Sequence, residues 1–248
     1  MAVDSKQVIV VMPAYNAAKT LADTVGLIPH EVVDHIILVD DGSRDATVAV
    51  ARELGLDVIP HHHNAGYGAN QKTCYTIALQ MGADIVVMLH PDGQYDPKLI
   101  PDIVRPIADD SADVVLASRM MTPGGAKLGG MPWWKRGANR ALTAVENLAL
   151  SQQLSEAHTG YRAFSRHALE VLPWRRNAND FVFDSQMIFQ AFAFGLRVEE
   201  IPVSTVYEAD SSSASFGQSA VYGAKTLGVA ARYALHRSRL RRSRLFES

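Results

Sequence analysis

The first half of the chain alternates short runs of Val and Ile with helical segments, and this alternation constrains the fold more than any other feature. Apolar runs of this length, bounded by Pro, Asp or Gly, are typical of strands buried on both faces. Strands are predicted at residues 7–12, 35–39, 57–60, 84–89 and 113–117, and helices between them at residues 17–27, 43–54, 69–81 and 97–108. Strands that alternate with helices predict an α/β fold with a mostly parallel sheet flanked by helices.

The second half is predicted to be more helical. Helices are expected at residues 133–150, 182–194 and 219–237, with a long strand or strand pair at 196–207 and a serine-rich loop at 208–217. Neither a repeat nor a convincing linker divides the chain. We therefore expect one α/β domain over residues 1–210, and a flexible loop with a C-terminal amphipathic, basic helix over residues 211–248.

Composition excludes several classes of protein. The 248 residues are 48% hydrophobic, which is enough for a real core, and a formal net charge of -2 argues against a protein built around polyanion binding. Cys74 is the one cysteine, which excludes a disulfide framework and a cysteine-based zinc site and favours a reducing compartment. Uninterrupted apolar runs stay well short of the ~18 residues of a membrane-spanning helix, and the N-terminus does not resemble a signal peptide.

Polar residues follow the predicted strands at their carboxyl ends, where ligands bind in parallel sheets. These segments are residues 13–16 (PAYN), 40–43 (DDGS), 64–72, 90–94 (HPDGQ) and 118–119. Both G-x-G-x-x-G and the P-loop motif are missing from the sequence. A bound nucleotide is therefore expected to be held by carboxylates and a metal ion, not by a glycine cradle.

Six segments in order resemble family 2 glycosyltransferases of the GT-A (Rossmann-like) fold: VIVVMPAYN, LVDDGS, NAGYGANQKT, HPDGQYDP, ASR and HTGYRAFSR. The resemblance covers residues 6–207 and is greatest to the polyprenyl-phosphate (dolichyl-phosphate) mannosyl- and glucosyltransferase branch. It implies an inverting, metal-dependent transfer of a hexose from a nucleotide-diphosphate sugar, of the GDP-mannose or UDP-glucose type, to a polyprenyl phosphate. Two alternatives are a transferase with a hydroxyl acceptor, on a glycan or small metabolite, and a non-catalytic nucleotide-sugar-binding protein.

The resemblance implies which residues bind the donor. One of the carboxylates of Asp40 and Asp41 is expected to accept hydrogen bonds from the base or ribose, although a helix-capping turn would also use one of them. Tyr15 is expected beside the base. Further contacts with the nucleotide or its phosphates are expected from Pro13, Asn16, Asn64, Gly66, Lys72, Asp92 and His158.

The acidic segment departs from the family pattern. The family places Asp-x-Asp here to hold Mg²⁺ or Mn²⁺ against the diphosphate, and this chain has His90-Pro-Asp92-Gly-Gln94. Asp92 is the strongest candidate for a metal ligand, and Gln94 offers a further oxygen. His90 as an imidazole ligand would shift the preference toward Mn²⁺ or another transition ion. The alternative is that His90 supports the ligands from behind or is simply structural.

Three arginines bear on the acceptor. Arg119, Arg136 and Arg162 stand at positions that match the family's site, and together they suggest a site for two phosphate groups, the donor's diphosphate and an acceptor phosphate. A phosphate acceptor is already ionised and needs no strong base, whereas a hydroxyl acceptor needs a carboxylate to take its proton. Asp184 is the candidate for that base, and its alternative role is a carboxylate favoured by a helix N-terminus.

The C-terminal segment is rich in arginine. An apolar stretch at residues 221–235 leads into Arg232, Arg237, Arg239, Arg241, Arg242 and Arg244. A helix of this kind attracts anionic lipid headgroups, while the scarcity of aromatic residues beside the arginines argues against a nucleic-acid partner. We therefore expect a cytoplasmic protein in peripheral contact with the cytoplasmic face of a membrane; a solvated tail is the alternative.

Overall fold

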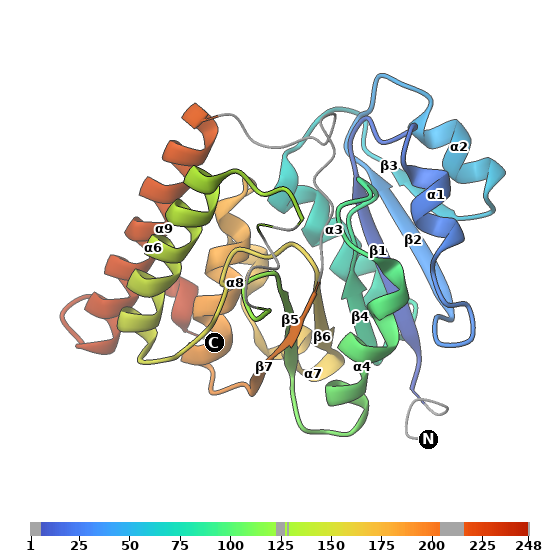
Figure 1. Ribbon diagram of the computed structural model, residues 1–248. Helices are drawn as coiled ribbons and strands as arrows, with labels where there is room; N and C mark the ends of the chain where they lie inside the picture. Colours follow the sequence, from blue (N-terminus) through green and yellow to red (C-terminus); the bar gives the residue numbers. More distant parts are fainter. Residues whose placement is uncertain (1–5, 123–126, 128, 204–215, 248) are drawn as a thin grey trace.

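One sheet runs through the middle of the molecule in the computed structural model, which describes residues 6–122, 127, 129–203 and 216–247 (Figure 1). Within these residues the sheet has seven strands in the order β3-β2-β1-β4-β6-β5-β7. The strands are β1 Val8–Ala14, β2 His35–Asp40, β3 Asp57–Pro60, β4 Ile85–Met88, β5 Val114–Ser118, β6 Arg162–Ser165 and β7 Val198–Pro202. The α-helices are α1 Leu21–Gly26, α2 Thr47–Glu53, α3 Tyr67–Gln80, α4 Ile100–Ala108, α6 Trp133–Leu150, α7 Arg166–Val171, α8 Val182–Ala193 and α9 Phe216–Arg237. Short 3₁₀ helices are η2 Pro97–Leu99, η3 Trp174–Arg176 and η4 Arg244–Phe246.

The sheet is mostly parallel, as predicted, with one antiparallel strand. β6 lies between β4 and β5 and runs against both of them. In this register Arg162, the first residue of β6, pairs with Met88 on β4 and with Leu116 on β5. Because β6 starts where its neighbours end, Arg162 lies at the same edge of the sheet as the carboxyl ends of the parallel strands.

The strands are buried on both faces because their side chains alternate between two hydrophobic clusters. On β1, Ile9 and Val11 join one cluster while Val8 and Val10 join the other. The first cluster lies between the sheet and the helices α3, α7, α8 and α9, and the second lies under α1, α2 and α4. The parallel-sheet prediction rested on runs of Val and Ile, and these runs do fill both cores.

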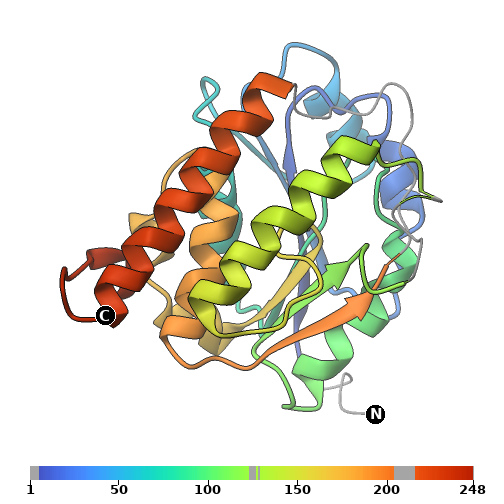
Figure 2. The same cartoon turned by 60° about the vertical axis from the view of Figure 1, so that its left-hand side comes forward.

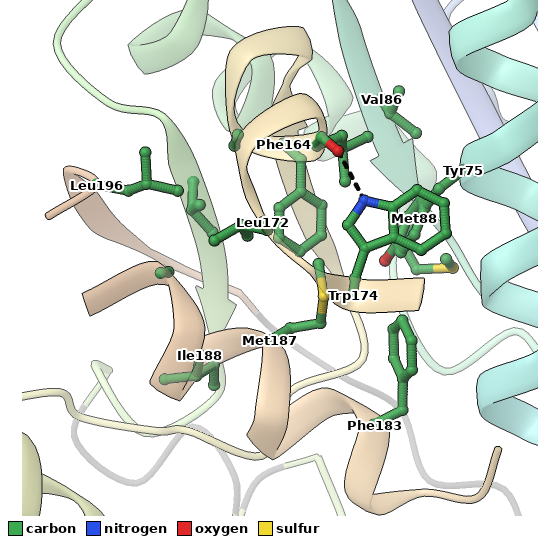
Figure 3. Close-up of a cluster of buried hydrophobic side chains, with 14 of the residues drawn as sticks. Tyr75, Val86, Met88, Phe164, Leu172, Trp174, Phe183, Met187, Ile188 and Leu196 are labelled. Atoms are coloured by element: carbon green, nitrogen blue, oxygen red, sulfur yellow. Dashed lines mark hydrogen bonds between the residues drawn. The ribbon is translucent and has the colours of Figure 1, made fainter. Parts of the chain in front are cut away.

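Trp174 lies in the middle of the first cluster (Figure 3). Side chains from the sheet and from α3 and α8 surround it, and its indole nitrogen donates a hydrogen bond of 2.7 Å to the Leu169 carbonyl. This hydrogen bond satisfies the polar atom of a fully buried ring. The cluster anchors α8, and the first turn of α8 carries Asp184.

The helices α6 and α9 run side by side on the outside of the molecule (Figure 2). Both begin on the side toward which the parallel strands point, and α8 lies between α9 and the sheet (Figure 1). The core-facing residues of α9 are Thr226, Val229, Ala230 and Tyr233. No helix among the described residues combines the length and the apolar character needed to cross a bilayer.

The predicted elements agree with the structure to different degrees. The strand at 57–60 and the helix at 133–150 have the predicted bounds, and the last helix begins at Phe216 where residue 219 was expected. The helix expected at 17–27 is shorter, because the Ala17 amide donates to Thr47 Oγ1 and the chain enters α1 only at Leu21. Of the strand or strand pair expected at 196–207, the structure has β7 at Val198–Pro202, and residues 204–207 lie outside the described residues. The predicted boundary near residue 210 and most of the loop 208–217 lie outside the described residues.

Candidate active site

The residues predicted for the donor and acceptor come together along the edge of the sheet where the parallel strands end. The ends of β1 and β2 and the loops after β1 to β5 carry most of them, the antiparallel β6 brings Arg162 to the same edge, and His158 lies in the segment just before β6. The helices α3, α6 and α8 supply the rest. This is the edge at which the sequence predicts the site, and the topology brings the predicted segments together there.

The two carboxylates of Asp40 and Asp41 are both buried but have different surroundings. Asp41 accepts hydrogen bonds from the amides of Ala65 and Gly66, at 2.8 and 2.9 Å, and from His61 Nδ1 at 2.8 Å. Asp40 accepts one from the Ser43 amide at 3.0 Å through Oδ2, and its Oδ1 has no hydrogen-bond partner among the described residues. Asp41 therefore holds the loop before α3, and Asp40 is the carboxylate with acceptor capacity left over.

The loop after β1 leaves an aromatic ring open. Pro13 is inside β1, and Tyr15 follows it with 47% of its surface exposed. Asn16 has a φ of 52°, and its side-chain oxygen accepts from the Arg44 amide at 2.8 Å. Asn tolerates this left-handed conformation better than most residues, so the loop is fixed by backbone and amide bonds while the Tyr15 ring remains available.

Gly66 and Lys72 lie against residues 177–179, a segment that carries no motif of its own. A Cβ on Gly66 would lie 2.5 Å from the Asn179 carbonyl oxygen, and Gly66 has a φ of +99°. The Lys72 ammonium donates to the Asn177 carbonyl and to Asn179 Oδ1, and burial lowers its pKa. Lys72 therefore ties α3 to residues 177–179, while Asn64 lies exposed before α3. The predicted contacts of Lys72 and Asn64 with phosphate or nucleotide stay predictions.

His90 and Asp184 are joined through Tyr67. The Tyr67 hydroxyl lies 3.1 Å from His90 Nε2 and donates to Asp184 Oδ2 at 2.8 Å. The Tyr67 and His90 rings are stacked, with centroids 5.6 Å apart and 13° between their planes. The histidine that replaces the family's first aspartate is thus connected to the candidate base on α8.

The Asp184 carboxylate is held by two hydrogen-bond donors and one ion pair, and 13% of its side chain is exposed. Besides Tyr67, the Gln71 amide donates to Oδ1 at 2.9 Å, and Arg162 Nη1 lies 3.5 Å from the same oxygen. Arg162 is only 2% exposed and also donates to the carbonyls of Thr159 and Asp184. In this conformation the Arg162 guanidinium contacts Asp184 and two backbone carbonyls, and its predicted contact with a phosphate stays a prediction.

Arg119 forms a buried ion pair with Glu156. Its guanidinium and its backbone amide both donate to the Glu156 carboxylate, and Asn139 on α6 donates to the same group at 2.7 Å. Burial alone would raise the pKa of Glu156, but the Arg119 charge and these hydrogen bonds bring it below its usual value. Arg119 directly follows β5, as predicted. Its charge is already paired with the carboxylate of Glu156.

Arg136 is the predicted phosphate ligand with the most freedom. It lies in the first turn of α6, is partly buried, and its side chain makes no hydrogen bond or ion pair with any residue that the structure describes. The neighbouring Lys135 has a pKa lowered by burial and by the Arg119 charge. This start of α6 is therefore a cationic region with an available guanidinium.

His158 lies between α6 and α9. Its Nδ1 is 2.7 Å from the Tyr222 hydroxyl, and its Nε2 is 3.0 Å from Glu146 Oε2, close enough for an ion pair although the angle is not that of a hydrogen bond. Both ring nitrogens thus face protein groups. The predicted contact of His158 with the diphosphate or metal stays a prediction.

One carboxylate oxygen of Asp92 is available to bind a divalent cation. Its Oδ1 accepts from the Gln94 amide at 3.1 Å, while Oδ2 receives no hydrogen bond from the described part of the chain. Groups of three or more His, Cys, Asp or Glu side chains that could enclose a metal ion do not occur among those residues. The residues present fit Mg²⁺ or Mn²⁺ when a bound diphosphate supplies other oxygen ligands.

Several residues of this site were not predicted. Tyr67 and Gln71 lie inside the NAGYGANQKT segment, but nothing in its spacing indicates that both side chains turn toward Asp184. Glu156 shortly precedes the HTGYR segment and carries no sequence signal of its own. Its role depends on the position of Arg119, a residue 37 positions earlier in the chain.

The sequence matches known glycosyltransferases over most of its length. A family model described as glycosyl transferase family 2 matches residues 9–172. The chain is 31% identical to a UDP-N-acetylglucosamine–dolichyl-phosphate N-acetylglucosaminyltransferase of Methanococcus voltae, covering 82% of this chain and 86% of the relative. It is 26% identical to an undecaprenyl-phosphate mannosyltransferase of Micrococcus luteus, covering 94% and 99% of the two chains. An uncharacterised protein of Methanocaldococcus jannaschii is 30% identical over 91% of each chain.

Solved structures show the same fold. Glucosyl-3-phosphoglycerate synthase from Mycobacterium tuberculosis superposes with a TM-score of 0.72 at 20% identity, over 94% of this chain and 81% of the other. A second crystal structure of that enzyme contains Mn²⁺, uridine diphosphate and phosphoglyceric acid, and it superposes with a TM-score of 0.71 at 18% identity over 94% and 80% of the chains. At this level of identity the likeness shows the fold alone.

Proposed function

The chain belongs to glycosyl transferase family 2, and from this premise we propose that it transfers a hexose, with inversion, from a nucleotide-diphosphate sugar to a polyprenyl phosphate. Relatives that align over most of their own length are named as transferases to dolichyl or undecaprenyl phosphate, with UDP-N-acetylglucosamine named as donor in one of them. A donor of the GDP-mannose or UDP-glucose type is proposed here.

The state of Asp184 supports a phosphate acceptor in particular. A hydroxyl acceptor needs a free carboxylate, whereas a phosphate oxygen is already ionised at neutral pH. Both oxygens of Asp184 already accept hydrogen bonds, from Tyr67 and Gln71, and Arg162 lies beside them. Asp184 is therefore better suited to fixing the site than to taking a proton, and this is the observation on which the choice of acceptor rests.

The other residues have distinct parts in the proposed reaction. Asp40, with an unused oxygen, accepts hydrogen bonds from the nucleotide, and the exposed Tyr15 ring lies against the base. Asp92 holds a divalent cation, which when bound offsets the charge of the departing diphosphate. Arg136 is free to bind a phosphate, whereas the charge of Arg119 is already paired with Glu156.

The outward faces of α6 and α9 support peripheral contact with a membrane. Large apolar residues are exposed on both helices, among them Trp133 at 78% and Leu148 at 83% on α6, and Val221, Leu227 and Leu235 on α9. The exposed charged residues of the two helices are all cationic, and more arginines follow α9. Helices that expose apolar and positively charged side chains suit an anionic bilayer, so we propose that α6 joins the C-terminal basic helix in this contact.

A donor and acceptor panel tests the proposed reaction. Purified protein is incubated with GDP-mannose, UDP-glucose or UDP-N-acetylglucosamine, with Mg²⁺ or Mn²⁺, and with or without a polyprenyl phosphate, and release of nucleotide diphosphate is measured. We expect release with one donor that requires both the lipid and the cation. Release with a hydroxyl acceptor instead would overturn the choice of acceptor, and donor binding without release under any condition would overturn the proposed catalysis.

Vesicle binding tests the membrane contact. Leu148→Glu combined with Leu227→Glu is expected to weaken binding to vesicles of phosphatidylglycerol and phosphatidylcholine at least ~10-fold. Each leucine contributes about 2 kcal/mol when it is buried in the bilayer, and 1.4 kcal/mol is a factor of ten. Co-sedimentation measures the effect. Leu27→Glu with Leu54→Glu, two exposed leucines outside α6 and α9, is the control, and equal losses in both pairs would contradict the contact.

A further inference from the structure

The hydrogen bonds of Tyr67 determine where the proton of His90 lies. The Tyr67 hydroxyl is between two partners, His90 Nε2 at 3.1 Å and Asp184 Oδ2 at 2.8 Å. A tyrosine phenol carries one proton at neutral pH, so it can donate only one of these two hydrogen bonds. An ionised carboxylate can only accept, so Tyr67 gives that proton to Asp184.

The oxygen of Tyr67 must therefore accept from His90. The donor in that second bond is Nε2–H, because the phenol has no further proton to give. In a neutral imidazole one nitrogen is protonated and the other carries a lone pair. A proton on Nε2 thus leaves Nδ1 of His90 as a nitrogen acceptor.

The packing around His90 keeps the ring in this orientation. A Cβ on Gly160 would lie 2.8 Å from both Nε2 and Cδ2 of His90, so only a residue without a side chain lets that edge of the ring sit so close to the backbone. The Tyr67 ring stacks on the imidazole. The enclosed edge carries Nε2, and Nδ1 belongs to the opposite edge of a side chain that remains partly exposed.

We propose that Tyr67, held by Asp184, fixes His90 in the tautomer protonated on Nε2, so that Nδ1 serves as a neutral nitrogen ligand for the divalent cation beside Asp92. This inference rests on the proposed function, because the cation belongs to the proposed donor site. A histidine that binds a metal through one nitrogen commonly donates its other N–H to a group linked to a carboxylate, which fixes the tautomer and raises the basicity of the ligand. Here the tyrosine stands between the histidine and the carboxylate.

The proposal explains how the site works without the family's first aspartate. Replacing a carboxylate by an imidazole removes one negative charge from the metal site. It also substitutes a nitrogen donor, which suits Mn²⁺ and other transition ions better than Mg²⁺. Mn²⁺ is therefore expected to bind the protein with a nucleoside diphosphate more tightly than Mg²⁺ does. Reducing the basicity of His90 should therefore weaken the binding of Mn²⁺ more than the binding of Mg²⁺.

Two spectroscopic measurements on the full chain test the proposal without relying on activity. Long-range ¹H–¹⁵N correlation spectra of histidine-labelled protein report the tautomer, with the His90 signal identified by its loss in His90→Asn. Pulsed electron paramagnetic resonance of Mn²⁺ with GDP or UDP detects a directly bound imidazole nitrogen. The affinity for Mn²⁺ is obtained by titrating the protein with Mn²⁺ and measuring the concentration that stays free. Tyr67→Phe removes the hydroxyl that links His90 to Asp184.

Tyr161→Phe is the matched control, because its hydroxyl is also buried, lies next to Gly160 along the chain, and has no hydrogen-bond partner among the described residues. We expect the Nε2–H tautomer in the wild type and a nitrogen coupling that disappears in His90→Asn. We also expect a loss of Mn²⁺ affinity of about 10-fold in Tyr67→Phe and none in Tyr161→Phe. Thermal melts of both variants establish that they fold.

Three results would overturn the proposal. They are an Nδ1–H tautomer in the wild type, a nitrogen coupling that is absent or that survives in His90→Asn, and equal Mn²⁺ affinities in Tyr67→Phe and Tyr161→Phe. None of these measurements uses a sugar donor or a lipid. The spectroscopic results can therefore be interpreted even if the proposed transfer reaction fails. The transfer assay can likewise be interpreted if this proposal fails.

Discussion

Replacing Asp92 by Asn is expected to lower the rate of sugar transfer by about 100- to 1,000-fold while leaving the fold intact. The carboxylate has one oxygen that receives no hydrogen bond from the described residues, which is the oxygen offered to the cation. A cation at a departing diphosphate contributes several kcal/mol to the transition state, and each 1.36 kcal/mol is a factor of ten in rate. Asn retains the acceptor for the Gln94 amide but removes the negative charge. Nucleotide-diphosphate release at saturating donor measures the effect.

Asp96→Asn provides the matched control for Asp92→Asn. Asp96 lies in the same loop, is exposed, and accepts a hydrogen bond from the Lys98 amide at the start of η2. Asn is equally good in that capping position, so the variant loses the same charge from the same loop without touching the proposed metal site. Equal rates for Asp92→Asn and the wild type would remove Asp92 from the reaction. Equal losses in both variants would assign the effect to the charge of the loop as a whole.

The sequence predicts the parts of this fold that depend on local pattern. The Val and Ile runs at β1, β2 and β4 are buried on both sides of the sheet, as the absence of polar alternation indicates. β6 was not predicted, because its four residues RAFS contain only two apolar side chains. That segment is a strand because β4 and β5 lie on either side of it with unpaired edges, a property of residues far away in the chain.

The candidate site was also predicted from the sequence only in part. The strand ends were predicted, since parallel strands bring their carboxyl ends to one edge. The different roles of Asp40 and Asp41 were not, because they depend on which carboxylate the loop before α3 reaches. The pairing of Tyr67 with Asp184 joins residues 117 positions apart, and no local spacing encodes it. The motif residues thus give the place of the chemistry, while long-range packing sets the hydrogen bonds that tune it.

Replacing Glu156 by Gln is expected to lower the free energy of unfolding by about 3–5 kcal/mol at pH 7, as when one partner of a buried ion pair is removed. Glu156 is fully buried and accepts hydrogen bonds from Arg119 and Asn139. The glutamine amide would present N–H groups to the N–H groups of Arg119, and the arginine charge would stay buried without its counter-ion. Urea unfolding at pH 7 measures the loss. Glu170→Gln is the control, because the exposed Arg166–Glu170 pair is worth less than about 1 kcal/mol.

The same pair gives a pH dependence with a defined sign. The pKa of Glu156 in the folded protein lies below the ordinary value of 4.5, so the folded state favours the ionised form. Its contribution to stability is therefore complete above about pH 4.5 and is lost as the pH falls through the lowered value. Other carboxylates with lowered pKa values, such as Asp45 and Asp113, titrate in wild type and variant alike and cancel in the difference. The gap in unfolding free energy between wild type and Glu156→Gln should thus be constant from pH 7 to about pH 5.5 and narrow below pH 4.5. A gap that stays constant down to pH 3 would mean that Glu156 stabilises the fold through its shape and hydrogen bonds and not through its charge.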